Sequence, residues 1–203
     1  IAPFVLEYFS WQGMWWVGIF ITMIMITWTF LIPTLALQGQ TESYKTGPVD
    51  PLNNTQKRLL WLAALVFMLW STQYFAFMTW LPVYFIEQLG FSLGESLMGY
   101  VWPIIIIIIF NLLTGVALRK GIPVGTLLVI GLTIQAAVWW LIPLTQVNVT
   151  GILALGFYGM AAGIIATCLF ALPGTVTGRS GSAAIAFGFI VTGRNLGVFI
   201  GPI

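Results

Sequence analysis

Arg194 is the charged residue that the surrounding sequence explains least. It lies fifteen positions after Arg179 in a stretch that otherwise holds no charge, and a helix would carry it about 22 Å along its axis over that distance. A charge at the centre of a bilayer costs from about 2.5 to more than 10 kcal/mol and usually faces a cavity or a partner. Because a guanidinium offers a planar fork of donors that matches a carboxylate, Arg194 is a candidate anchor for an anionic substrate. Asn195 could add a neutral donor. The alternative is an arginine satisfied by backbone carbonyls or by an acid on another helix.

A second candidate is an aromatic face in the apolar run 59–86. Its members follow i, i+3, i+7, i+10 and i+14 spacing, which places them on one side of a helix; they are Trp70, Gln73, Phe77, Trp80 and Tyr84. A face that combines aromatic rings with a mid-depth Gln suits the wall of a cavity that holds an organic solute. It also suits ordinary helix packing.

Small residues repeat at intervals of four near the end of the chain and in the run before it. The first set is Gly193, Gly197 and Gly201, followed by Pro202, and the second is Gly159 and Gly163. Stacked small residues let membrane helices approach closely, either for static packing or for rocking and sliding. Pro82 and Pro103 are expected to break or bend their helices, as gating segments do.

Isolated polar residues in the apolar runs have two interpretations. Asn111 and Thr114 share a helix face, and Tyr158 lies in a later run. They could contact a solute, but membrane helices commonly use such residues to hold one another together. Cys168 reads as a small buried apolar residue. With one cysteine, no histidine and no close carboxylate pair, the sequence predicts no metal site, no cofactor and no enzyme.

The composition sets the class of protein. Of the 203 residues, 60% are hydrophobic, 15% aromatic and only 6% charged, with a net charge of +2. Soluble domains carry about 25% charged residues, so a soluble or disordered chain is excluded. A nucleic-acid-binding protein is excluded too, because it would need a clustered basic stripe. The prediction is an all-α, polytopic transmembrane helical bundle in contact with the lipid bilayer.

The charges separate apolar runs long enough to cross a bilayer, which takes about 20 residues per helix. Ser92-Leu-Gly-Glu95 is a capping-box pattern at one helix start, and Pro143 to Asn148 is a turn-prone stretch inside the longest uncharged run. The expected helices are 12–37, 59–87, 94–118, 122–142, 151–173 and 182–203, after the end of another helix at 1–9.

The basic residues predict the orientation. Alternate loops hold Lys45, Lys57 and Arg58, then Arg119 and Lys120, then Arg179, and the other loops hold none. This asymmetry places the basic loops in the cytoplasm, including the polar segment 38–58, which is interpreted as a linker between two membrane bundles. The predicted location is the plasma membrane, in bacteria the inner membrane.

Three stretches resemble the major facilitator superfamily of transporters. Thr79 to Ser92 resembles the outer half of helix 7 and the loop after it. Thr192 to Pro202 is similar to helix 11 of bacterial members, particularly cyanate and organic-anion permeases, and Ile1-Ala-Pro-Phe4 is similar to the glycine–proline motif of helix 5. The resemblance implies a partial bundle, about six and a half helices of twelve.

This resemblance also implies a domain organisation. Residues 1–37 would hold late helix 5 and helix 6, residues 38–58 the central loop, and residues 59–203 helices 7 to 11, with helix 12 missing.

The function expected from the residues and the resemblance together is secondary active transport of a small solute, an organic or inorganic anion, by alternating access. Arg194 would bind the anion, and Gln73, Trp80 and Tyr84 would shape the rest of the site. A coupling ion, H⁺ or Na⁺, would use residues on other helices. One alternative is export of drugs or other hydrophobic compounds; another is a channel or a non-transporting membrane scaffold.

Overall fold

The computed structural model describes residues 52–141, 149–177 and 183–203. The chain separates into two units, Ile1–Pro48 and Val49–Ile203, and the described residues all belong to the second. The predicted helices at 1–9 and 12–37, most of the 38–58 loop and the turn at 143–148 lie outside the described residues. The division into domains therefore stays a prediction.

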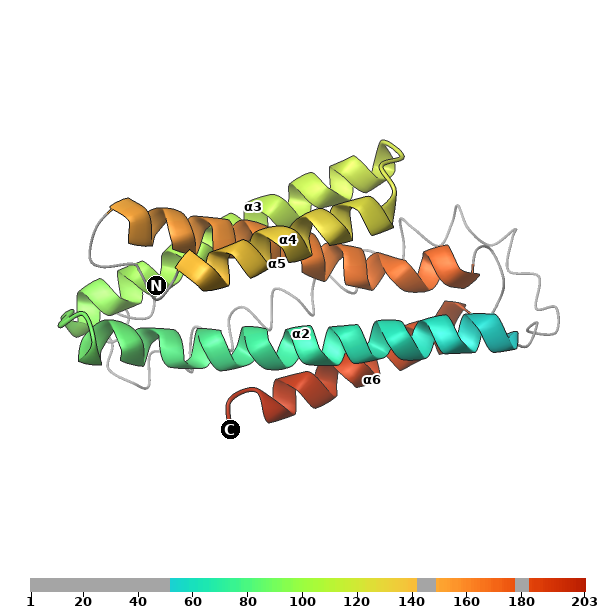
Figure 1. Ribbon diagram of the computed structural model, residues 1–203, viewed down its shortest axis with the longest axis horizontal. Coiled ribbons are helices and arrows are strands. Elements are labelled where there is room, and N and C mark those ends of the chain that lie inside the picture. The colour runs from blue at the N-terminus through green and yellow to red at the C-terminus, as the bar shows by residue number, and fades with distance from the viewer. Residues whose placement is uncertain (1–51, 142–148, 178–182) are drawn as a thin grey trace, which may run out of the picture. The chain divides into compact units, whose positions relative to one another are not determined.

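Five α-helices make up the described part of the second unit. They are α2 (Asn54–Glu87), α3 (Leu93–Arg119), α4 (Val124–Leu141), α5 (Val149–Thr177) and α6 (Ala183–Ile200). Each is long and apolar enough to cross a membrane. Figure 1 shows them running along the long axis, with α2, α4 and α6 starting at one end and α3 and α5 at the other. The predicted all-α class is confirmed for these residues.

The helix starts follow from local hydrogen bonds. Asn53 caps α2: its side-chain oxygen accepts from the Gln56 backbone N–H at 2.8 Å, and Gln56 Oε1 accepts from the Asn53 N–H at 3.0 Å. The prediction that this helix begins at residue 59 was therefore wrong by five residues. The Ser92–Glu95 capping box was predicted correctly, and α3 starts at Leu93.

The helices continue through their prolines. Pro82 lies inside α2, Pro103 inside α3 and Pro173 inside α5. Pro82 and Pro103 therefore do not break their helices; that they bend them stays a prediction. Packing against neighbouring helices holds such segments in place: Pro103 is buried, and the Pro82 carbonyl accepts a hydrogen bond from Ser96 Oγ of α3 at 2.9 Å.

Helix packing is closest where glycines meet a neighbouring backbone. A Cβ added to Gly159 of α5 would lie 2.6 Å from the Pro103 carbonyl oxygen, and one added to Gly163 would lie 2.7 Å from that of Ile107. Gly193 and Gly197 of α6 are packed still more tightly against the α2 carbonyls of Ala64 and Met68. Gly201, just after α6, lies against Thr72. These contacts join α3 to α5 and α6 to α2.

Helix α5 is the most buried of the five and packs against all the others. One core cluster lies in the half of the bundle where α2 begins, around Phe67, Ile165 and Ile190. Another lies in the half where α2 ends, around Leu81, Phe85 and Tyr158. A hydrogen bond at 3.2 Å from Gln56 Nε2 to the Val176 carbonyl ties the start of α2 to the end of α5.

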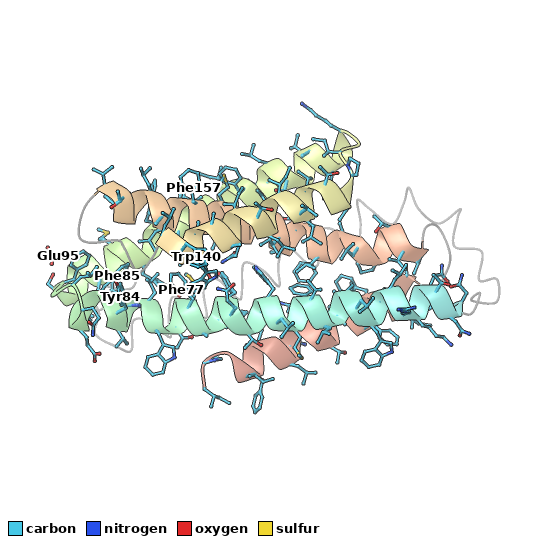
Figure 2. The ribbon with its side chains drawn as sticks, viewed as in Figure 1. Phe77, Tyr84, Phe85, Glu95, Trp140 and Phe157 are labelled. Atoms are coloured by element: carbon cyan, nitrogen blue, oxygen red, sulfur yellow. The ribbon has the colours of Figure 1, made fainter. Side chains whose placement is uncertain are left out.

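Much of the exposed surface of the described residues is apolar. Large hydrophobic side chains are exposed on several helices, with Met98 at 77% and Trp140 at 83% exposure. Such exposure is unfavourable in water and natural in contact with lipid. Figure 2 shows Trp140 and Phe157 among these side chains on α4 and α5.

Candidate functional site

The centre of the unit holds a polar contact between α2 and α5. Gln73 Nε2 donates to the Tyr158 hydroxyl at 3.1 Å, and Tyr158 is completely buried. Aromatic rings surround it: the centroid of Phe77 lies 4.3 Å away, that of Trp139 at 6.2 Å and that of Tyr74 at 6.4 Å. A buried hydroxyl needs a hydrogen-bond partner, and Gln73 provides one.

Gln135 of α4 is a polar residue of this centre that the sequence analysis did not single out. It is only 6% exposed and lies close to the Tyr158 hydroxyl. Its amide atoms do not reach good hydrogen-bond geometry with any described residue. A lone Gln four residues before Trp139 in an apolar run is the sequence signal that could have identified it.

A cavity of about 930 Å³ opens between α2, α3, α4 and α5, in the half of the bundle where α2 ends and α3 begins. We call this half the outer end, after the orientation predicted from the basic residues, and the space the outer cavity. Figure 2 shows that Phe77, Tyr84 and Phe85 all lie in the half of α2 that ends near Glu95. Volumes of about 300–1,000 Å³ suit drug-sized ligands.

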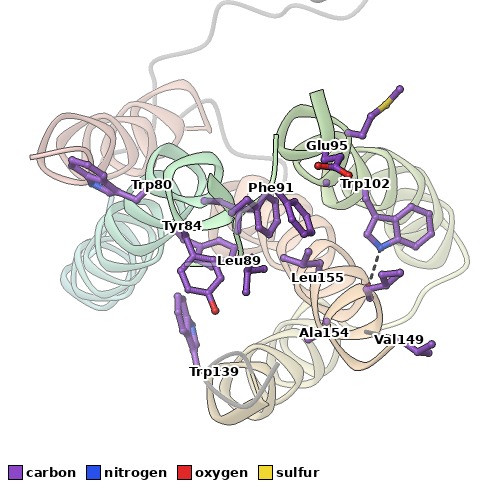
Figure 3. A pocket seen from close by; sticks show the side chains of 17 residues that line it. Trp80, Tyr84, Leu89, Phe91, Glu95, Trp102, Trp139, Val149, Ala154 and Leu155 are labelled. Atoms are coloured by element: carbon purple, nitrogen blue, oxygen red, sulfur yellow. Dashed lines mark hydrogen bonds between the residues drawn. The ribbon is translucent and has the colours of Figure 1, made fainter. Parts of the chain in front are cut away.

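The predicted aromatic face of α2 contributes three residues to this cavity, Phe77, Trp80 and Tyr84. In Figure 3, Tyr84 and Trp139 stand on one side and Trp102 on the opposite side, with Leu89 and Leu155 between them. Trp70, the first member of the face, does not line the cavity. It stacks on Tyr74 with 5.2 Å between ring centroids, and its buried indole N–H has no hydrogen-bond partner among the described residues.

The cavity wall includes residues that sequence reasoning missed. Among them are Phe91 in the α2–α3 loop, Glu95 and Trp102 on α3, and Trp139 on α4. Trp102 Nε1 donates to the Ile152 carbonyl at 3.0 Å, drawn as the dashed line in Figure 3. This bond fixes the ring between α3 and α5.

Arg194 lies on a different side of α2. Its guanidinium carbon is 5.9 Å from the centroid of the Phe75 ring, and its Nη1 donates to Asn195 Oδ1 at 3.1 Å. Residues two apart are about 200° apart around a helix, so Phe75 and Phe77 point to nearly opposite sides. Arg194 and Asn195 are therefore not brought together with Gln73, Phe77 or Tyr84.

No described acid is within reach of Arg194. The acids of the described ranges are Glu87 and Glu95, at the end of α2 and the start of α3. Glu87 follows Phe75 by twelve residues, which is about 18 Å along α2. The half-buried guanidinium thus has a ring face and one amide as partners among the described residues.

The remaining polar residues make helix contacts. Thr167 Oγ1 on α5 donates to Asn111 Oδ1 on α3 at 2.8 Å, and Thr114 is buried. The hydrogen bond of Asn111 and the burial of Thr114 favour a packing role for these two residues. Cys168 is a buried free thiol, and within the described ranges no three His, Cys, Asp or Glu residues form a group that could hold a metal ion.

Comparison with known proteins gives one match. The family model for the Major Facilitator Superfamily matches residues 1–202, nearly the whole chain. Searches of curated proteins and of solved structures found no match. The match agrees with the five membrane-length helices of the fold. The chain therefore belongs to the Major Facilitator Superfamily, whose members are multi-pass membrane proteins that act as secondary transporters.

Proposed function

We propose that this transporter carries a small organic or inorganic anion by alternating access, and that Arg194 binds the anionic group. The observation that supports this proposal is a guanidinium that has no carboxylate partner in the described part of the chain. It lies within a membrane-length helix, and no carboxylate among the described residues neutralises it. A charge in such a position marks a substrate path in many membrane proteins.

Asn195 has a supporting role in this proposal. Because its Oδ1 accepts from Arg194 Nη1, it limits the orientations of the guanidinium. Its amide N–H groups stay available as neutral donors to the same anion. The face of Phe75 holds the other side of the guanidinium, a contact that attracts a cation without neutralising it.

The close contacts of Gly193, Gly197 and Gly201 with α2, and of Gly159 and Gly163 with α3, are compatible with helices that stay packed together when the bundle moves. We propose that these glycines, with Pro82 and Pro202, serve packing and gating during alternating access. The ligand would bind between the two halves of the transporter.

Uptake by the full-length protein in proteoliposomes tests the proposal. Small carboxylates should compete for uptake in the wild type, and Arg194→Ala should abolish this competition, whereas Arg194→Lys should retain part of it. Arg119→Gln, which removes a basic residue at the end of α3, serves as the matched control. Unchanged anion uptake in Arg194→Ala would overturn the proposal. Imposed H⁺ and Na⁺ gradients would identify the coupling ion.

A second candidate function is export of hydrophobic compounds, which the aromatic lining of the outer cavity favours. In that case dye efflux from cells would fall in Tyr84→Ala and persist in Arg194→Ala. An exchange experiment in proteoliposomes distinguishes these two transport functions from a channel or a non-transporting scaffold. Only a carrier shows saturable uptake that is accelerated by substrate on the opposite side of the membrane.

A further inference from the structure

Glu95 is the charged residue among those that line the outer cavity. It lies seven residues before Trp102, two turns of α3, so both occupy one face of the helix, and Met98 and Gly99 line the cavity between them. Glu87, the other described acid, ends α2 and is not part of the lining. The part of the cavity wall that the structure describes thus carries one negative charge.

The hydrogen bonds of Glu95 leave part of its carboxylate available. The Ser92 N–H donates to Glu95 Oε2 at 2.9 Å, and the Ser92 hydroxyl donates to the same oxygen at 2.7 Å. Oε1 accepts no hydrogen bond from the described residues. These bonds fix the carboxylate in place, and its second oxygen can face a ligand.

Aromatic rings surround the rest of the cavity on three helices. Tyr84 comes from α2, Trp102 from α3 and Trp139 from α4 (Figure 3). The face of an aromatic ring attracts a cation, most strongly for Trp. Because Trp102 is held by the Ile152 carbonyl, its ring is already ordered before a ligand binds.

Among the described residues the lining holds no Lys or Arg, so an anion would find no cationic partner there. A neutral apolar ligand would contact the rings but gain nothing from the exposed Glu95 carboxylate. A cation with apolar groups would neutralise the carboxylate and contact the rings. We therefore propose that the outer cavity binds an amphipathic organic cation, an ammonium or phosphonium with aromatic substituents, with its charged centre beside Glu95.

This site is separate from the proposed anion site. Arg194 contacts Phe75 on a different side of α2 and does not line the outer cavity. The inference goes beyond the proposed function and does not depend on it, since binding can be measured without transport. Failure of the cation-binding proposal would leave the anion proposal unaffected. Failure of the anion proposal would likewise leave the cation-binding proposal unaffected.

Equilibrium binding to the full-length protein in nanodiscs tests the site. The probe is the cation tetraphenylphosphonium. The comparison is tetraphenylborate, an anion of nearly the same shape. The amount of each probe that partitions into empty nanodiscs is subtracted from the amount bound. We expect the cation to bind at least tenfold more tightly than the anion. Glu95→Gln should weaken cation binding at least fivefold and keep the helix start, because Gln is the other residue of the capping box.

Matched variants define the site further. Glu87→Gln removes an acid at the same end of the bundle and should change cation affinity less than twofold. Tyr84→Phe keeps the ring and should bind as the wild type does, whereas Tyr84→Leu should bind more weakly. Arg194→Gln should bind the cation normally. Equal affinity for the two probes, or unchanged affinity in Glu95→Gln, would overturn the proposal.

Discussion

Gly197 of α6 lies directly against the backbone carbonyl of Met68 in α2, with no room between them for a methyl group. This contact leads to a prediction about glycine substitutions. Gly197→Ala should lower the stability of the protein by about 1–3 kcal/mol, the usual cost of overpacking. Thermal unfolding in detergent measures the effect.

Gly188 is the matched control on the same helix, since nothing lies within 4 Å of the position that its Cβ would take. Gly188→Ala should leave stability unchanged or raise it by up to about 1 kcal/mol, because alanine favours the helix. If Gly197→Ala proves as stable as Gly188→Ala, the described α2–α6 contact is incorrect.

The bond between Gln73 and Tyr158 predicts an energetic coupling across α2 and α5. Tyr158→Phe keeps the ring and removes the hydroxyl, and Gln73→Met removes the donor. Hydrogen bonds between membrane helices average about 0.6 kcal/mol in double-mutant cycles, so a cycle on these two residues should give a coupling of that size. Additive effects on thermal stability would show that the bond does not form.

The contact between Arg194 and Phe75 predicts a second coupling. Phe75→Leu should lower stability by about 0.5–2 kcal/mol, the range for a cation over an aromatic ring. In an Arg194→Met background the same change should cost much less, because the cation is gone. An equal cost in both backgrounds would mean that Phe75 acts through packing alone.

The orientation can be tested with engineered cysteines. Cys168 is the one native cysteine of the sequence and is buried, so Cys168→Ala provides a background for labelling. Gln88→Cys, in the turn between α2 and α3, should react with a membrane-impermeant maleimide added outside intact cells. Lys120→Cys, after α3, should react only when the membrane is opened. The reverse pattern would contradict the predicted orientation.

The helices could be predicted from the sequence because charges are costly in a bilayer and therefore cluster at helix ends. The α3 boundaries were predicted within one residue, 94–118 against Leu93–Arg119. The start of α2 was missed because residues 54–58 are polar yet helical, held by the Asn53 cap. The expected helix 151–173 ends four residues before Thr177, the last residue of α5, which continues past Pro173.

The candidate site could be predicted only within one helix. Helical spacing placed Phe77, Trp80 and Tyr84 on one face, and they line one cavity. Spacing within α2 does not tell how α3 and α4 are rotated about their own axes, so Trp102 and Trp139 could not be found. The sequence analysis assigned Arg194 and Gln73 to one site because both are expected near the middle of the membrane. An equal depth in the membrane does not determine on which side of α2 each side chain lies.

Three hydrogen bonds hold α2 to its neighbours at different depths: Gln56 to Val176, Gln73 to Tyr158 and Ser96 to Pro82. From Gln56 to Pro82 they span 26 residues of the helix, about 39 Å. Sliding α2 lengthwise or turning it about its axis would stretch at least one of them. A displacement of α2 alone would therefore break hydrogen bonds that a displacement carrying α5 and α3 along with it would keep.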